Sequence, residues 1–350
     1  MVNDVRAGLP QWRGWVETDL DDLRAEVTGW ATSTAMRDLV ECFGQRWPSG
    51  DGDGDGDVDV VLAGLEEISA RHWDFRGGRE RAAAVPGEFS DGVADRVWAA
   101  ADALGLRGRN LPDGSAYDHV LIHGGLLRGC LARAGHAADL LDGTVEAGEV
   151  CGLGSFRPTT EPELAMAAEA GLGQPADEFD AMDVALRATL PGALPDTDSP
   201  TTDGTDSPTT VGVGSPTTGA DGVPASHRVR EYRTAGGRRV RVLAAPSSDP
   251  GRRANTADTC TFWADAVGRP APGQRVLLVT TEHYVPFQHA DAIRVLGIPY
   301  GCAVETVGVD PTAAVHGLPG QPLTTGQYLQ EIRSAIRSLR HLTGALRPAG

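Results

Sequence analysis

The sequence contains no lysine, so all 31 of its basic residues are arginine. They are outnumbered by 48 acidic residues, which gives a formal net charge of −17. An acidic surface repels phosphate backbones, and we therefore expect no nucleic acid among the partners. The missing lysine also excludes the standard P-loop, which needs one to reach the phosphates of a nucleotide.

Paired cysteine motifs and long apolar runs are absent as well. The five cysteines form no C-x-x-C pair, which argues against a zinc site and favours buried, reduced thiols. No metal site is predicted. No apolar run approaches the roughly 20 residues needed to span a bilayer, and the first 15 residues lack the apolar core of a secretion signal. These observations predict a cytoplasmic protein without membrane contact.

Residues 1–112 are predicted to form a helical N-terminal subdomain. Apolar residues recur there at steps of three and four positions, as in "DLDDLRAEVTGW" and "FSDGVADRVWAAADALGL". An alternating Asp-Gly run, "DGDGDGD", interrupts the pattern at 51–57. It lacks the terminal glutamate of a calcium-binding loop, so we interpret it as a solvated loop.

The rhythm changes after residue 113, where short apolar runs alternate with amphipathic segments. The runs are "DHVLIHGG", "EVCGLGSF", "RRVRVLAAPS", "QRVLLVTTEHY" and "GCAVETVGVD". Such alternation is typical of a parallel sheet covered on both faces. It predicts an α/β domain with a Rossmann-like, doubly wound, mainly parallel sheet of about five strands, built from residues 113–191 and 227–350 and closed by a C-terminal helix. The Ser/Pro/Thr-rich segment 192–226 is predicted to be a disordered insertion.

Candidate binding residues are those that follow each run, because ligands of open parallel sheets lie beyond the carboxyl ends of the strands. The glycine turn after the first run leaves room for a ligand, and the following helix start favours an anion. Packing alone would also explain that turn, as helix capping would explain the Asn-Thr pair. The candidates are Gly124, Gly125, Arg128, Ser155, Arg157, Asn255, Thr256, Thr280, Thr281 and Tyr284.

Three residues are candidates for catalysis. His283 stands next to Glu282 at the end of the fourth run, and an imidazole has a suitable pKa for proton transfer. A hydrogen-bonded loop histidine is the alternative. Glu161 opens a helix, where it would contact a ligand hydroxyl or only stabilise the helix start.

Several spaced segments resemble the YdcF-like group, which includes the ElyC and SanA proteins. They are "VLIHGG", "GLGSFRPTTEPELAMAAEAG", "NTADT" and "VLLVTTEHYVPFQHADAIRVLGIP". The resemblance implies a Rossmann-like domain with a ligand cleft at those loops, and S-adenosylmethionine as one ligand. The order His283-Tyr284 inverts the Tyr-His of that group, and its following basic residue is replaced here by Phe287.

The leading hypothesis from the sequence is an enzyme that binds a nucleotide-like or phosphorylated small molecule and catalyses group transfer or hydrolysis. The alternative is a non-catalytic ligand-binding or regulatory module. No particular cofactor, substrate or oligomeric state follows from the residues.

Overall fold

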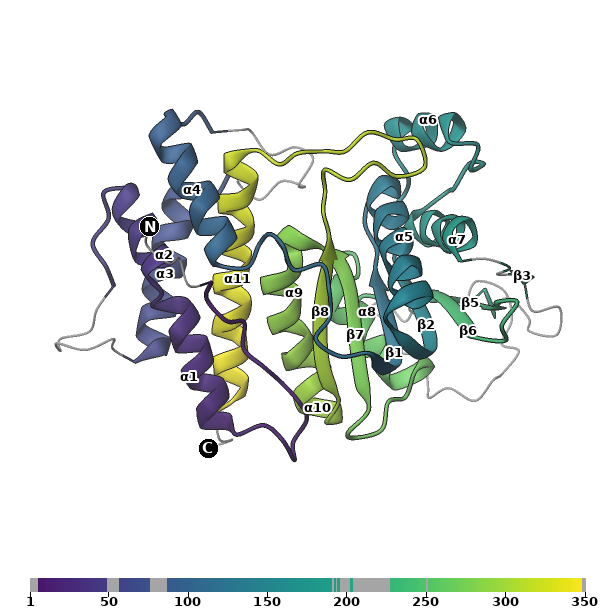
Figure 1. Ribbon diagram of the computed structural model, residues 1–350, viewed down its shortest axis with the longest axis horizontal. Helices are drawn as coiled ribbons and strands as arrows, with labels where there is room; N and C mark the ends of the chain where they lie inside the picture. The colour runs from purple at the N-terminus through teal and green to yellow at the C-terminus, as the bar shows by residue number, and fades with distance from the viewer. Residues whose placement is uncertain are drawn as a thin grey trace.

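A computed structural model describes residues 6–48, 57–75, 87–190, 192, 194–195, 202–203, 227–249 and 251–347. A mixed β-sheet lies at its centre (Figure 1). The longer strands within these residues are β1 (Ala116–His123), β2 (Glu146–Gly154), β5 (Arg228–Arg233), β6 (Arg239–Ala244), β7 (Arg275–Thr281) and β8 (Ala303–Val309). Two two-residue strands, β3 (Leu194–Pro195) and β4 (Thr202–Asp203), pair with β5.

The sheet is mostly parallel, which confirms the prediction of an α/β protein. The strands run in the order β5-β6-β2-β1-β7-β8, with β6 to β8 parallel and β5 antiparallel to β6. Along the chain, the order of the parallel strands reverses between β1 and β7. The predicted number of about five strands omitted β5, whose sequence "RVREYR" is charged because most of its side chains are only half-buried.

Helices cover both faces of the sheet (Figure 1). One face carries α5 (Leu127–Gly143) and α7 (Glu178–Thr189), and α6 (Glu161–Glu169) contacts α5. The other carries α8 (Thr256–Phe262) and α9 (Val285–Ala292), with α11 (Thr325–Ala345) packed against α9. Because both faces are covered, β1 and β7 are buried along most of their length, which explains the apolar runs at 120–122 and 276–279.

The N-terminal helices share a hydrophobic core with the sheet. They are α1 (Leu20–Ala31), α2 (Thr34–Cys42), α3 (Val58–His72) and α4 (Asp91–Ala103). Trp30 and Leu62 from these helices belong to the same buried cluster as Leu121 of β1 and Leu278 of β7. No boundary in the core therefore separates the N-terminal helices from this face of the sheet. The Asp-Gly run up to residue 56 and most of the 192–226 insertion lie outside the described residues.

The segment before α1 lies along the outer strand β8. Trp12 and Val304 form an antiparallel bridge, in which the Val304 N–H donates to the Trp12 carbonyl over 3.0 Å. The Trp12 indole is buried and donates to the Cys302 carbonyl over 2.7 Å. His289 Nε2 lies 2.7 Å from the Pro10 carbonyl oxygen, which can only accept, so this nitrogen carries a proton.

All five cysteines are free thiols, and four of them are buried, as the sequence predicted. Across the described part of the chain, none of the helices is both long and apolar enough to cross a bilayer.

Candidate functional site

The glycine turn follows β1 at the point where the strand order reverses. A side chain at Gly124 would overlap the Leu153 carbonyl of β2 and the Glu178 carboxylate of α7. A Cβ at Gly125 would lie 3.2 Å from Arg133 Nη1, a tight contact with the flexible end of a side chain. Packing against β2 and α7 is therefore sufficient to explain Gly124, whereas Gly125 is less constrained.

The start of α5 is occupied by a carboxylate of the chain itself. Leu126 stands at the N-cap and offers no capping oxygen, and Glu163 Oε1 accepts from the Leu127 N–H over 2.9 Å. Arg157 donates to both oxygens of the same carboxylate, from Nη2 to Oε1 over 2.8 Å and from Nη1 to Oε2 over 2.9 Å. Burial raises the pKa of Glu163, but the bonds from Arg157 and from the Thr160 and Leu127 N–H groups outweigh it and lower the pKa to about 2. Glu163 is thus ionised in the place predicted for a ligand anion.

Arg157 and Ser155 lie at the glycine turn. Arg157 Nη2 donates to the Gly125 carbonyl over 3.1 Å, and its Nε lies 3.3 Å from Glu178 Oε2. Ser155 Oγ donates to the same Glu178 oxygen over 2.9 Å. The loop after β2 is therefore joined to the loop after β1, and both predicted residues are brought to the turn.

Arg133 joins the ends of β1 and β7. This buried side chain donates from Nη1 to the His123 carbonyl over 2.9 Å and from Nε to Thr281 Oγ1 over 3.0 Å. Its guanidinium carbon lies 5.5 Å from the ring centre of Tyr284. We call these residues the glycine-turn cluster: Gly124, Gly125, Arg133, Ser155, Arg157, Glu163, Glu178 and Thr281.

Thr280 points to the opposite face of the sheet, because neighbouring strand residues alternate. Its Oγ1 is buried without a hydrogen-bond partner, and so is Nε2 of His123. The register of β1 and β7 places these two residues on neighbouring strands. Burial, reinforced by Arg133, lowers the pKa of His123 to about 3, so this imidazole is neutral.

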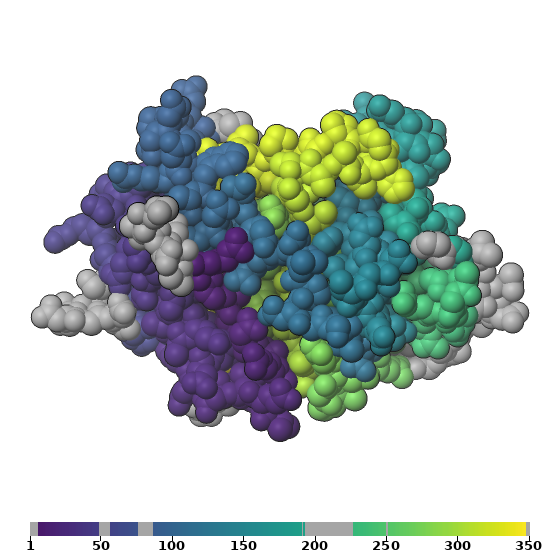
Figure 2. All heavy atoms as spheres, in the orientation of Figure 1, coloured from purple at the N-terminus to yellow at the C-terminus, as the bar shows by residue number. Residues whose placement is uncertain are grey.

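Arg128 holds a segment of the protein. Its Nε donates to the Pro319 carbonyl over 2.8 Å, and its Nη2 donates to the carbonyls of Pro311 and Ala313 over 3.1 and 2.7 Å. These carbonyls belong to residues 310–324, which cross the top of the molecule between β8 and α11 (Figures 1 and 2). Arg128 is thus placed as an anchor of this crossing segment.

Asn255 and Thr256 lie at the start of α8. Asn255 Oδ1 accepts from the Asp258 N–H over 3.0 Å, and Asp258 in turn accepts from the Asn255 N–H over 2.9 Å, a capping box. Arg252 forms an ion pair with Asp258. β2 lies between β6, which leads to this helix, and β1, which leads to the glycine turn. Capping explains Asn255, and the two predicted anion positions do not meet.

The three catalytic candidates do not form a common group of contacts. Glu282 is buried, and its Oε2 accepts from the Gly108 N–H over 2.7 Å; burial raises its pKa. His283 is buried with its ring 3.8 Å from that of Tyr284, measured between centres. Glu161 is exposed on the first turn of α6.

Two mycobacterial proteins are similar to the chain over nearly its whole length. They are the proteins named "Uncharacterized protein Rv3785", from Mycobacterium tuberculosis strain H37Rv, and "Uncharacterized protein Mb3814", from Mycobacterium bovis. Each is 30% identical over 351 residues, which cover 92% of this chain and 90% of the relative. The chain belongs to the Rv3785 family.

The N-terminal helices carry a second match to the Rv3785 family. Residues 15–105 match the family model described as the Rv3785 N-terminal domain. No solved structure matches the chain. The resemblance to the YdcF-like group is therefore wrong, and S-adenosylmethionine binding, which only that resemblance implied, is not proposed for this chain. The segments behind it have local explanations in this fold, such as capping by Asn255 and close packing at Gly124.

Two carboxylates of this Rv3785 family member, Glu163 and Glu178, were not among the site residues predicted from the sequence. Glu163 had a readable signal, because "TEPE" at 160–163 is a capping box in which the glutamate three residues after the threonine reaches back. Glu178 had none, since only the packing of α7 against β2 brings it to the turn. Among the residues that the structure describes, no group of three His, Cys, Asp or Glu side chains is arranged to hold a metal ion.

Proposed function

We propose that the chain binds a nucleotide-like or phosphorylated small molecule at the glycine-turn cluster, in a Rossmann-like arrangement. The observation that carries the proposal is the reversal of strand order between β1 and β7, with the glycine turn and Arg133 at that point. Adjacent loops diverge at such a reversal and leave the crevice in which sheets of this type bind ligands.

In this proposal the anionic group of the ligand takes the place of Glu163. The Leu127 N–H and the two terminal nitrogens of Arg157 now converge on that carboxylate. A phosphate oxygen pair accepts the same forked donors, and the start of a helix favours its charge. Leu126, which is 48% exposed, and the half-buried Phe156 provide apolar surface beside this position for the rest of the ligand.

A thermal-shift screen with AMP, ATP, glucose 6-phosphate and inorganic phosphate tests the proposal. A ligand that binds the folded state raises the melting temperature. We expect at least one of the organic phosphates to do so, and Arg157→Ala to abolish the ligand-induced shift. Arg187→Ala is the matched control, because this half-exposed arginine pairs with Asp183 on α7, outside the cluster. An equal ligand-induced shift in Arg157→Ala, or no shift with any of the four compounds, would refute the proposal.

For catalysis of group transfer or hydrolysis, His283 remains the proposed proton-transfer residue. His283→Ala would then abolish turnover of the identified ligand while its binding is retained. Unchanged turnover would remove His283 from the mechanism.

One observation favours the alternative of a non-catalytic module. Glu282 binds the Gly108 N–H rather than His283, and the Gly308 N–H donates to the Arg109 carbonyl over 2.7 Å. These bonds tie the ends of β7 and β8 to the chain just after α4. A ligand at the cluster could thereby alter the N-terminal helices. Hydrogen exchange in α4 with and without ligand tests this, since a binding module predicts a change there and no turnover.

A further inference from the structure

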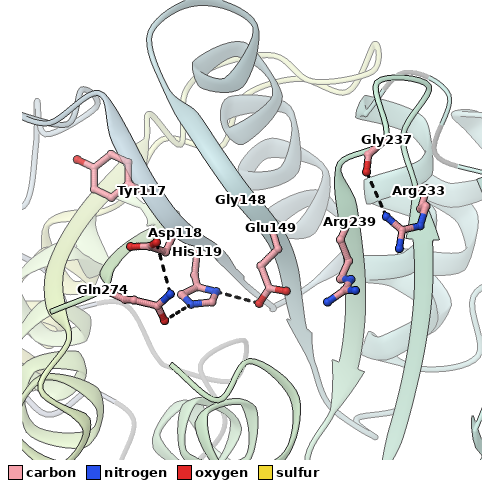
Figure 3. Close-up of a pocket in the computed structure, with 9 residues that line it drawn as sticks. All are labelled: Tyr117, Asp118, His119, Gly148, Glu149, Arg233, Gly237, Arg239 and Gln274. Atoms are coloured by element: carbon pink, nitrogen blue, oxygen red, sulfur yellow. Dashed lines mark hydrogen bonds and ion pairs between the residues drawn. The ribbon is translucent and has the colours of Figure 1, made fainter. Parts of the chain in front are cut away.

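A second candidate site lies at the opposite, amino edge of the sheet. A cavity of about 500 Å³ opens there beside the first residues of β1 and β2 and the β5–β6 hairpin (Figure 3). Its size is within the range of small-molecule sites. Figure 3 shows Asp118 and Gln274 on one side of Glu149, and Arg239 and Arg233 on the other.

Four charged side chains form a row across neighbouring strands at this cavity. The register pairs His119 with Glu149, Glu149 with Arg239, and Arg239 with Arg233. Residues directly opposite one another point to the same face of a sheet. The row therefore presents its charges together at the floor of the cavity.

The surroundings of His119 in this row favour its charged form. Its Nδ1 lies 2.9 Å from Glu149 Oε1, and its Nε2 lies 3.1 Å from Gln274 Oε1. The Gln274 oxygen also accepts from the Ala271 N–H over 2.8 Å, so both ring nitrogens of His119 face acceptors and both must donate. Burial lowers the pKa of His119, but the bonds to Glu149 and Gln274 outweigh it and raise the pKa overall.

The ion pairs along this row join more cations than carboxylates. Glu149 is shared by His119 and Arg241, which lies 3.2 Å from it, and Glu231 is shared by Arg241 and Arg239, each at 3.1 Å. Among the described residues, these ion pairs thus join two carboxylates to three cations, His119 on β1 and Arg241 and Arg239 on β6. The surplus falls at Arg239, whose side chain is 43% exposed.

Negative charge is placed at the other end of the cavity. The carboxylate of Asp118 accepts from the backbone N–H of Arg275 over 2.8 Å and from the side-chain amide of Gln274 over 3.4 Å. Both donors are neutral, and the neighbouring His119 ring bonds to Glu149 and Gln274 rather than to Asp118. Two strand spacings, about 10 Å, separate β1 from β6 and hence the two ends.

We propose that this cavity binds a small zwitterion of the size of a dipeptide, with its carboxylate on Arg239 and its ammonium group on Asp118. Separated opposite charges in the cavity match separated opposite charges in the ligand, and either charge alone would leave one end unpaired. The proposal is independent of the glycine-turn cluster, which lies at the other edge of the sheet.

Titration calorimetry with alanyl-alanine, its N-acetyl derivative and its C-terminal amide tests the proposal. We expect alanyl-alanine to bind, and each derivative, which lacks one of the two charges, to bind at least tenfold more weakly. Arg239→Ala and Asp118→Asn should each weaken binding of alanyl-alanine tenfold or more. Arg71→Ala, an exposed arginine on α3, should leave it unchanged.

Three outcomes would overturn the proposal. They are no binding of alanyl-alanine to the intact chain, equal binding of the N-acetyl derivative, which marks a general anion site, and unchanged binding by both cavity variants. Circular dichroism and the melting temperature verify that each variant is folded before its titration is interpreted.

Discussion

The two edges of the sheet differ in how far their charged side chains are enclosed by other residues. At the carboxyl edge, Arg157 is enclosed by Glu163 and Glu178, and the crossing segment 310–324 is fastened over α5 by Arg128. At the amino edge, His119, Glu149 and Arg239 lie in a row at an open cavity. The carboxyl edge has the position of a ligand site but fills it with its own carboxylate, whereas at the amino edge His119 and Glu149 are buried, Arg239 is half-exposed and Asp118 is exposed.

The strand order therefore determines where a ligand site can lie, whereas the side chains at that position determine whether it is open or filled. A ligand at the carboxyl edge must displace the buried Glu163, while a ligand at the amino edge must share the half-exposed Arg239 with Glu231. The following predictions, from the largest expected effect to the smallest, test the two edges separately.

The largest difference in stability is expected between alanine substitutions at the two glycines of the turn. Gly124→Ala places a methyl group on the Leu153 carbonyl and the Glu178 carboxylate, and we expect it to lower the free energy of unfolding by about 3 kcal/mol or more. Gly125→Ala meets only the end of the Arg133 side chain, so its effect should be below about 1 kcal/mol. Urea denaturation of both variants measures the difference. Equal losses would contradict the packing described at Gly124.

Glu163→Gln should be the next most damaging change. It removes the buried partner of the half-buried Arg157, which keeps one carboxylate instead of two, and we expect the free energy of unfolding to fall by about 3 kcal/mol at neutral pH. The pKa of Glu163 is lowered on folding, so its contribution is present above its unfolded pKa of about 4.5 and disappears as the pH falls toward 2. The difference in stability between wild type and variant should therefore shrink on acidification.

The control for that experiment is Glu161→Gln, which changes an exposed residue of the same helix turn. It should have nearly the stability of the wild type at neutral pH. A Glu163→Gln variant whose deficit stayed constant from pH 6 to pH 3 would show that the lost stability is not electrostatic.

Arg128→Lys should loosen the crossing segment without changing the net charge. A lysine cannot reproduce three bonds to the carbonyls of Pro311, Ala313 and Pro319, so we expect a loss of about 2 kcal/mol. Hydrogen exchange should rise in residues 310–324 and stay unchanged in β5 and β6. Unaltered exchange in 310–324 would mean that other contacts hold the segment.

The smallest effect is expected at the amino edge. The pKa of His119 is raised on folding, so its stabilising charge is fully present below the unfolded pKa of about 6.5 and is lost as the pH rises through the folded value. Wild-type stability should therefore fall on the alkaline side of pH 6.5, and His119→Gln should remove that part of the slope. An identical slope in both proteins would show that His119 does not carry the charge.

Much of the fold was readable because buried parallel strands are apolar on both faces. The five predicted runs correspond to β1, β2, β6, β7 and β8. β5 escaped notice because Arg228, Arg230 and Glu231 extend from half-buried positions into ion pairs with Asp177, Asp183 and Arg241. Such ion pairs depend on residues that are distant in the sequence, so no local sequence pattern predicts them.

The candidate site was predictable in position but not in detail. Gly124, Gly125, Ser155, Arg157 and Thr281 converge because the carboxyl ends of parallel strands share one edge. The pairing of Arg157 with Glu163 and Glu178 depends on how α6 and α7 dock, which the sequence does not reveal. For Thr280 and Thr281, only the strand register decides which one faces Arg133.

The bridge between Trp12 and Val304 has a consequence for solubility. An outermost strand offers unpaired backbone groups on which a strand of another molecule can dock. In this chain the Trp12 carbonyl already takes the Val304 N–H, and the indole covers the Cys302 carbonyl. Residues 10–12 therefore cover part of this outer strand, and we expect their removal to promote self-association through it.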